Sequence, residues 1–103
     1  MKKKKPYNVK MHFSKRCIER IGFPIDSNRL KSLLVENKLQ NVMRESNNKT
    51  HWLVPKELLP VEWDKEMVAV YDKVRHEFVT VIFRNPEDNL DHMRAILNER
   101  RKV

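Results

Sequence analysis

The chain has 103 residues, of which 35% are charged, and it carries a formal net charge of +8 at pH 7. This length predicts a single domain, and the absence of an 18-residue apolar run argues against a membrane span. Cys17 is the only cysteine, so an intrachain disulfide is excluded and we expect a reducing, cytoplasmic location. The basic excess favours a polyanionic partner, and RNA is the first candidate.

Residues 1–9 are predicted to form a flexible basic arm ahead of a single domain that spans residues 10–103. Lys2, Lys3, Lys4 and Lys5 supply four of the eight net charges, and a second basic run occupies residues 100–102. Two interpretations stand side by side for both runs. They are solvated tails, or they are polybasic segments that add phosphate contacts.

A first helix is predicted from about Met11 to Gly22. Phe13, Cys17 and Ile21 recur at four-residue spacing, as the buried face of a helix requires. We expect Cys17 to be a buried thiol. Gly22 is the only glycine of the chain, and it ends the helix because it adopts positive φ without steric cost.

The second helix is predicted to begin after Asp26, which is a good N-cap residue. Ile25 and Leu30 flank this start at the spacing of a hydrophobic staple. The short link over residues 22–25 favours a compact pair of helices.

Four strands are predicted after residue 40, where the hydrophobic period changes. Residues 46–49 and 73–76 have the composition of turns between them. Nearly every residue from Phe78 to Phe83 is apolar, so we expect that strand in the middle of the sheet. The strands are expected at residues 41–45, 50–54, 67–72 and 77–84.

The last helix is predicted to start at Pro86, with Asn85 as its N-cap. Its apolar stripe consists of Leu90, Met93, Ile96 and Leu97. The whole order predicts an α+β fold: two N-terminal helices, a four-stranded antiparallel sheet and a C-terminal helix. We expect the sheet to be a meander with the helices on one face.

Three residues of the first helix suit phosphate chemistry. His12, Arg16 and Arg20 lie four residues apart and therefore share one helix face. An imidazole exchanges protons near neutral pH, and guanidinium groups bind phosphate oxygens through a planar fork. A solvated polar helix face is the alternative interpretation of the same pattern.

The His12-x-x-x-Arg16-x-x-x-Arg20 helix, the capped second helix, the polar hairpin and the Val79–Phe83 run resemble the RelE-like ribonuclease superfold. The similarity is to its small branch, which includes phage RegB-type endoribonucleases and toxin-like domains. It covers about residues 10–84.

This resemblance implies a RelE-like architecture and cleavage of RNA without a metal or other cofactor. In that family a base takes the proton of a ribose 2′-OH, and cations stabilise the charged phosphorane. The resemblance assigns the base or acid role to His12 and charge stabilisation to Arg16 and Arg20. His51 is a candidate second proton carrier. Candidate RNA-binding residues are Lys15, Lys49 and Arg84.

Other interpretations remain open. The better-known toxins carry several Lys, Arg, Tyr or His residues on the sheet, and this chain carries few. One alternative is therefore a non-enzymatic small phage regulator that binds a host protein or a nucleic acid. Another alternative is a DNA-binding module. His51 is alternatively an exposed strand histidine without a catalytic role. Trp63 is expected to pack rather than to stack on bases.

Overall fold

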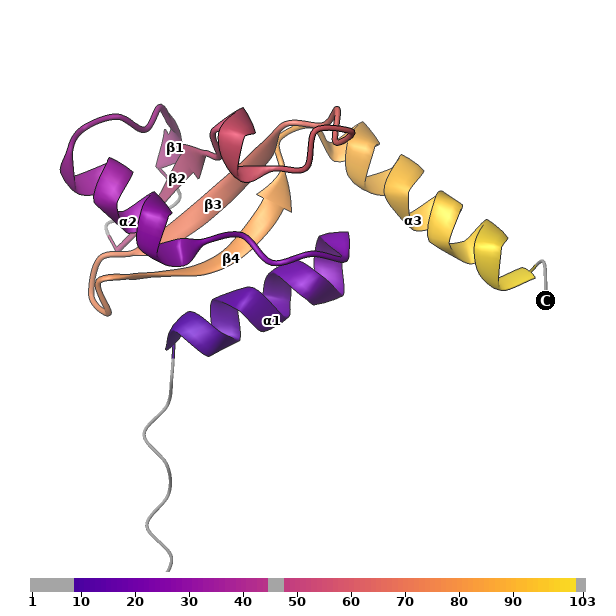
Figure 1. The fold of residues 1–103 in the computed structure, drawn as a ribbon, viewed down its shortest axis with the longest axis horizontal. Helices are drawn as coiled ribbons and strands as arrows, with labels where there is room; N and C mark the ends of the chain where they lie inside the picture. Colours follow the sequence, from indigo (N-terminus) through magenta and orange to yellow (C-terminus); the bar gives the residue numbers. More distant parts are fainter. Residues whose placement is uncertain (1–8, 45–47, 102–103) are drawn as a thin grey trace, which may run out of the picture.

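The structure is a computed structural model, and it describes residues 9–44 and 48–101. It confirms the predicted α+β fold (Figure 1). The helices are α1 (Val9–Ile21), α2 (Ser27–Val35) and α3 (Pro86–Arg101), with a short 3₁₀ turn η1 (Lys56–Leu58). The strands are β1 (Asn41–Arg44), β2 (Lys49–Leu53), β3 (Met67–Asp72) and β4 (Glu77–Phe83).

The predicted signals at the ends of the first two helices are confirmed. The Asp26 carboxylate accepts hydrogen bonds from the backbone N–H groups of Asn28 and Arg29, at 3.0 and 3.1 Å. Gly22 has φ +86°, the conformation that favours glycine after a helix. The first helix begins at Val9, slightly before the predicted start. Residues 1–8 of the predicted arm, residue 45 of the first predicted strand and residues 46–47 of the predicted turn lie outside the described residues.

The sheet is the expected antiparallel meander, with strand order β1-β2-β3-β4. The expectation that residues 77–84 form a central strand is wrong, because β4 lies at the edge and β3 lies inside the sheet. Four successive residues of β3, from Met67 to Val70, are buried, so both faces of this strand are covered. The apolar run of β4 has another cause: helix α1 packs on it.

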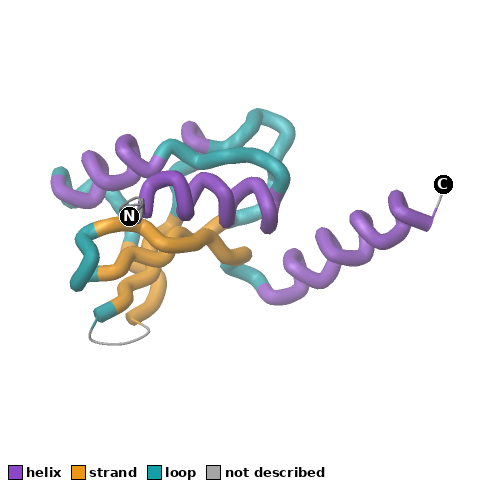
Figure 2. The backbone as a smooth tube through the Cα atoms, turned by 90° about the horizontal axis from the view of Figure 1, so that it is seen from below, coloured by secondary structure: helices purple, strands orange, loops and turns teal. Residues whose placement is uncertain are grey.

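The core forms between the sheet and α1. Phe13 and Cys17 are fully buried, and the ring of Phe13 lies 6.1 Å from that of Phe78 on β4. Leu30 and Leu33 of α2 join the same cluster. Figure 2 shows α1 and α2 on the same side of the sheet, as the sequence predicts.

Helix α3 departs from the prediction that all helices cover one face. It extends away from the sheet in both views (Figures 1 and 2). Its first turns are held by aromatic contacts, since the His92 ring lies 5.8 Å from Trp63 and 5.4 Å from Phe83. The predicted apolar stripe exists, but its residues Leu90, Met93 and Leu97 are about half exposed.

No helix in the described part of the chain is long and apolar enough to cross a membrane.

The buried thiol of Cys17 makes a prediction about stability at alkaline pH. Burial raises the pKa of Cys17 to about 11. The unfolded chain releases this proton near pH 9, so the contribution to stability is full below that pH and is lost as the pH rises toward 11. We expect the free energy of unfolding to fall by about 2 kcal/mol from this group alone.

Urea unfolding of wild type and Cys17→Ala at several pH values measures the contribution of the thiol to the free energy of unfolding. At neutral pH the variant is expected to be about 1 kcal/mol less stable, because it leaves a small cavity. The difference should shrink or reverse near pH 11. A constant difference across that range would contradict the assignment.

Candidate functional site

The three basic residues predicted to act together lie along one flank of α1. The core-facing positions of this helix, Phe13 and Cys17, fix its rotation on the sheet. His12 is then half-buried, while Arg16 and Arg20 are exposed to solvent. The structure therefore keeps the trio on one accessible strip of the helix, which we call the α1 stripe (His12, Arg16 and Arg20).

Within the α1 stripe, Arg16 links an imidazole to a carboxylate. Its Nε–H donates to His12 Nε2 at 3.2 Å, and its Nη1 lies 3.7 Å from Glu19 Oε2. In this arrangement His12 Nε2 is the acceptor, and its lone pair is directed at the Arg16 Nε–H. The Glu19 carboxylate, one turn along the same helix, thereby orients Arg16.

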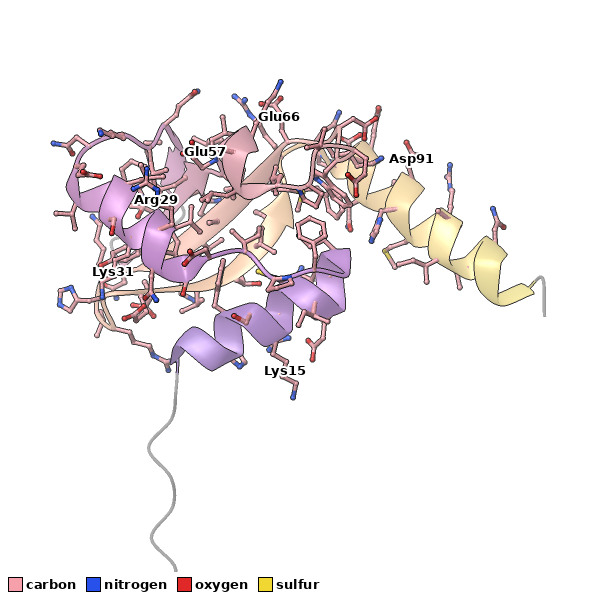
Figure 3. All side chains as sticks on the ribbon, in the orientation of Figure 1. Lys15, Arg29, Lys31, Glu57, Glu66 and Asp91 are labelled. Carbon is pink, nitrogen blue, oxygen red and sulfur yellow. The ribbon has the colours of Figure 1, made fainter. Side chains whose placement is uncertain are left out.

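Arg20 extends the positive strip toward the sheet edge. Together with Glu19 it lines a groove of about 610 Å³ whose wall includes Val81–Phe83 of β4. Lys15 extends away from the sheet on the outer side of α1 (Figure 3). Neither Arg20 nor Lys15 makes an ion pair within the part of the chain that the structure describes. Both charges are available to an anion.

His51 is not brought to the α1 stripe. On β2, the partly buried Trp52 packs against the core cluster, so its neighbour His51 points to the opposite face of the sheet. His51 is only 7% exposed, and its register partner on β3 is Val70, which is also buried. The interpretation of His51 as an exposed strand histidine is therefore wrong. The geometry does not support a proton relay between His51 and His12.

The remaining two candidates also lie apart from the stripe. The Arg84 guanidinium donates to Glu66 at 2.9 Å, so a carboxylate already neutralises it. Lys49 is exposed at the start of β2 and has its own contacts. Of the three expected RNA-binding residues, only Lys15 shares the helix of the catalytic candidates.

Sequence reasoning missed two long-range ion pairs and the anchor of α3. Glu66 pairs with Arg84, and Glu77 accepts from Lys31 at 2.9 Å across 46 residues of sequence. The anchor of α3 is His92, whose ring packs on Trp63 and Phe83. No local pattern signals these contacts, because each depends on how the strands and helices pack together.

Two further features bear on chemistry. Burial raises the pKa of the Tyr71 phenol, which lies on β3 against Phe78. Among the described residues, no group of three or more His, Cys, Asp or Glu side chains is arranged to hold a metal ion.

Comparison with protein-family models, with curated proteins and with solved structures gives no match for this chain.

The different settings of Arg16 and His51 predict opposite responses to mutation. Arg16→Ala removes an exposed side chain and a weak surface ion pair, so the free energy of unfolding should change by less than about 0.5 kcal/mol. His51→Ala removes a buried ring and should cost on the order of 1–3 kcal/mol. Urea unfolding of both variants measures this. A strongly destabilised Arg16→Ala would show that the α1 stripe is structural.

Proposed function

We propose that this chain binds RNA through the α1 stripe and cleaves it without a metal ion, in the manner of the RelE-like ribonucleases that its sequence resembles. The single observation that carries the proposal is the chain of contacts from Glu19 through Arg16 to His12 Nε2. It places an oriented guanidinium in contact with an imidazole on one accessible helix flank. Such a pair matches the two needs of phosphodiester transfer, a base and a fixed positive charge.

The charge distribution supports RNA as the ligand. Arg20 and Lys15 carry positive charges with no carboxylate partner in the described part of the chain, on either side of the His12–Arg16 contact. The first α-helix therefore offers several contacts to successive phosphates. The chain as a whole carries a net charge of +8, which attracts polyanions from a distance.

In the proposed reaction, Arg16 turns from His12 to the phosphate, and the Nε2 lone pair that this frees takes the proton of the ribose 2′-OH. The 2′-oxygen then forms a bond to the adjacent phosphorus, and the bond from phosphorus to the 5′-oxygen breaks. Arg16 and Arg20 stabilise the additional negative charge on the phosphorane. The 5′-oxygen takes its proton from solvent, since His51 lies on the other face of the sheet. The products are a 2′,3′-cyclic phosphate and a 5′-hydroxyl end.

One observation favours a second candidate, a binding protein without catalysis. Lys31 is paired with Glu77, and Arg84 is paired with Glu66. The candidate second proton carrier, His51, is buried away from the α1 stripe. An enzyme with one proton-transfer group turns over more slowly than one with two. A non-enzymatic RNA-binding regulator would use the same stripe for phosphate contacts alone.

Cleavage of end-labelled RNA in the presence of EDTA tests the enzymatic proposal. Wild type should cleave, and Arg16→Ala should lose activity by about 10²–10³-fold, as on removal of one transition-state donor. Arg16→Lys should restore only part of it, because an ammonium lacks the bidentate fork. His12→Ala should be inactive.

The matched control is Arg29→Ala, which removes an exposed arginine from α2 (Figure 3) and should leave cleavage unchanged. Equal activity in wild type and Arg16→Ala would refute the site. Binding by wild type without cleavage of any RNA would favour the non-enzymatic candidate.

A second prediction concerns the salt dependence of binding. Lysine and arginine release counterions from phosphates, so the affinity for single-stranded RNA should fall with salt, with a log–log slope of about −0.7 for each phosphate neutralised. Deletion of residues 2–5, all lysines, should flatten that slope and leave the thermal melt unchanged. Fluorescence anisotropy over a salt series gives the slope. Salt-independent binding, or none at low salt, would defeat the claim.

A further inference from the structure

Helix α3 exposes an apolar face that the rest of the described chain does not cover. Leu90, Met93 and Leu97 are 53%, 52% and 50% exposed, although they stand at the three- and four-residue spacings of a buried stripe. Exposed apolar residues scattered singly need no explanation, but a contiguous stripe on one helix marks an interaction surface. The helix itself extends away from the sheet (Figure 1).

This face continues into the groove beside β4. The groove holds about 610 Å³, and Met93, Ile96 and Leu97 form its α3 side. Val81, Ile82 and Phe83 of the edge strand form the opposite wall. An apolar edge strand next to an apolar helix is a combination that isolated domains avoid, because it invites association. The surface is therefore a largely apolar channel between α3 and β4, with Glu19 and Arg20 of α1 also in its lining.

The charges of α3 indicate which helix fits. Glu87, Asp88 and Asp91 lie in its first half, whereas its second half carries Arg94, Arg100 and Arg101 beside a single acid, Glu99. A helix with this polarity complements a copy of itself that runs in the opposite direction. A parallel copy would set acid against acid and base against base.

The spacing also supplies a register. Leu90, Met93 and Leu97 occupy the a, d and a positions of a heptad, and Glu87 and Arg94 are seven residues apart on its flank. In an antiparallel pair with Leu90 beside Met93 of the second copy, Glu87 lies beside Arg94 of the second copy. The twofold axis repeats this contact. Arg94 now makes only a 4.0 Å contact with Asp91 on the exposed surface, so it is available for this pairing.

We propose that α3 and the β4 groove form a homodimer interface, in which the α3 helix of a second copy docks antiparallel in the channel. The interface is isologous, because each copy supplies both the helix and the groove. The aromatic contacts of His92 with Trp63 and Phe83 fix the angle at which each α3 leaves its own domain. This inference does not depend on RNA cleavage, although Arg20 of the α1 stripe also lines the groove.

Sedimentation equilibrium of the full chain tests the dimer. The monomer mass is 12.5 kDa, and we expect twice that mass, with dissociation on dilution. Leu90→Glu combined with Leu97→Glu should give a monomer that still unfolds cooperatively in a thermal melt. The matched control is Val35→Glu, which places the same charge at an exposed apolar residue of α2, on the opposite side of the domain from α3 (Figure 1), and should leave the dimer intact.

Charge reversal tests the orientation. Glu87→Arg and Arg94→Glu should each weaken the dimer by about tenfold through like-charge contacts, and the double variant should recover most of the affinity. A wild type that stays monomeric up to about 1 mM, the limit of measurable specific association, would overturn the proposal. Persistence of the dimer in the Leu90/Leu97 variant, or failure of the double reversal to recover affinity, would also overturn it.

Discussion

The packing of α1 on β4 is the contact on which the rest of the structure depends. Phe13 and Cys17 are buried without residual exposure against the strand that contains Phe78 and Val81. Burial of four such side chains contributes on the order of several kcal/mol. The same contact fixes the rotation of the helix about its axis. Because the core side is fixed, His12, Arg16 and Arg20 are held along one accessible flank.

That arrangement explains why a helix can serve both as a core element and as a reactive surface. The Cys17 thiol is inert because it lies on the packed side, while residues one position away face solvent. Within the flank, Glu19 and His12 hold Arg16 from both sides. A guanidinium restrained in this way loses less conformational freedom when it binds a phosphate than an isolated surface arginine does.

The sequence predicts much of this fold because its signals are local. Asp26 and Gly22 mark helix ends through backbone chemistry, and the stripe from His12 to Arg20 follows from helical spacing alone. The order of strands needs tertiary information. The apolar run of β4 suggested a central strand, but it reflects the contact with α1 and the wall of the groove. His51 shows the same limit, since strand alternation places it on one of two faces, and only the packing of Trp52 decides which.

Strand β4 takes part in both proposed sites. It supports α1, which carries the proposed RNA site, and its C-terminal end leads into α3 and the proposed dimer channel. Arg20 lies where these regions meet, because it belongs to the α1 stripe and also lines the groove. A dimer built through α3 would therefore set two RNA sites in a fixed relation to each other.

The most direct test of the central claim is NMR titration of the isotope-labelled chain with a short RNA whose 2′-oxygens are methylated, so that it binds without cleavage. The account predicts that the largest shift changes cluster at His12, Arg16 and Arg20, with smaller ones at Lys15. Shift changes confined to α2 or to the face of the sheet that carries His51, or none at saturating RNA, would contradict it.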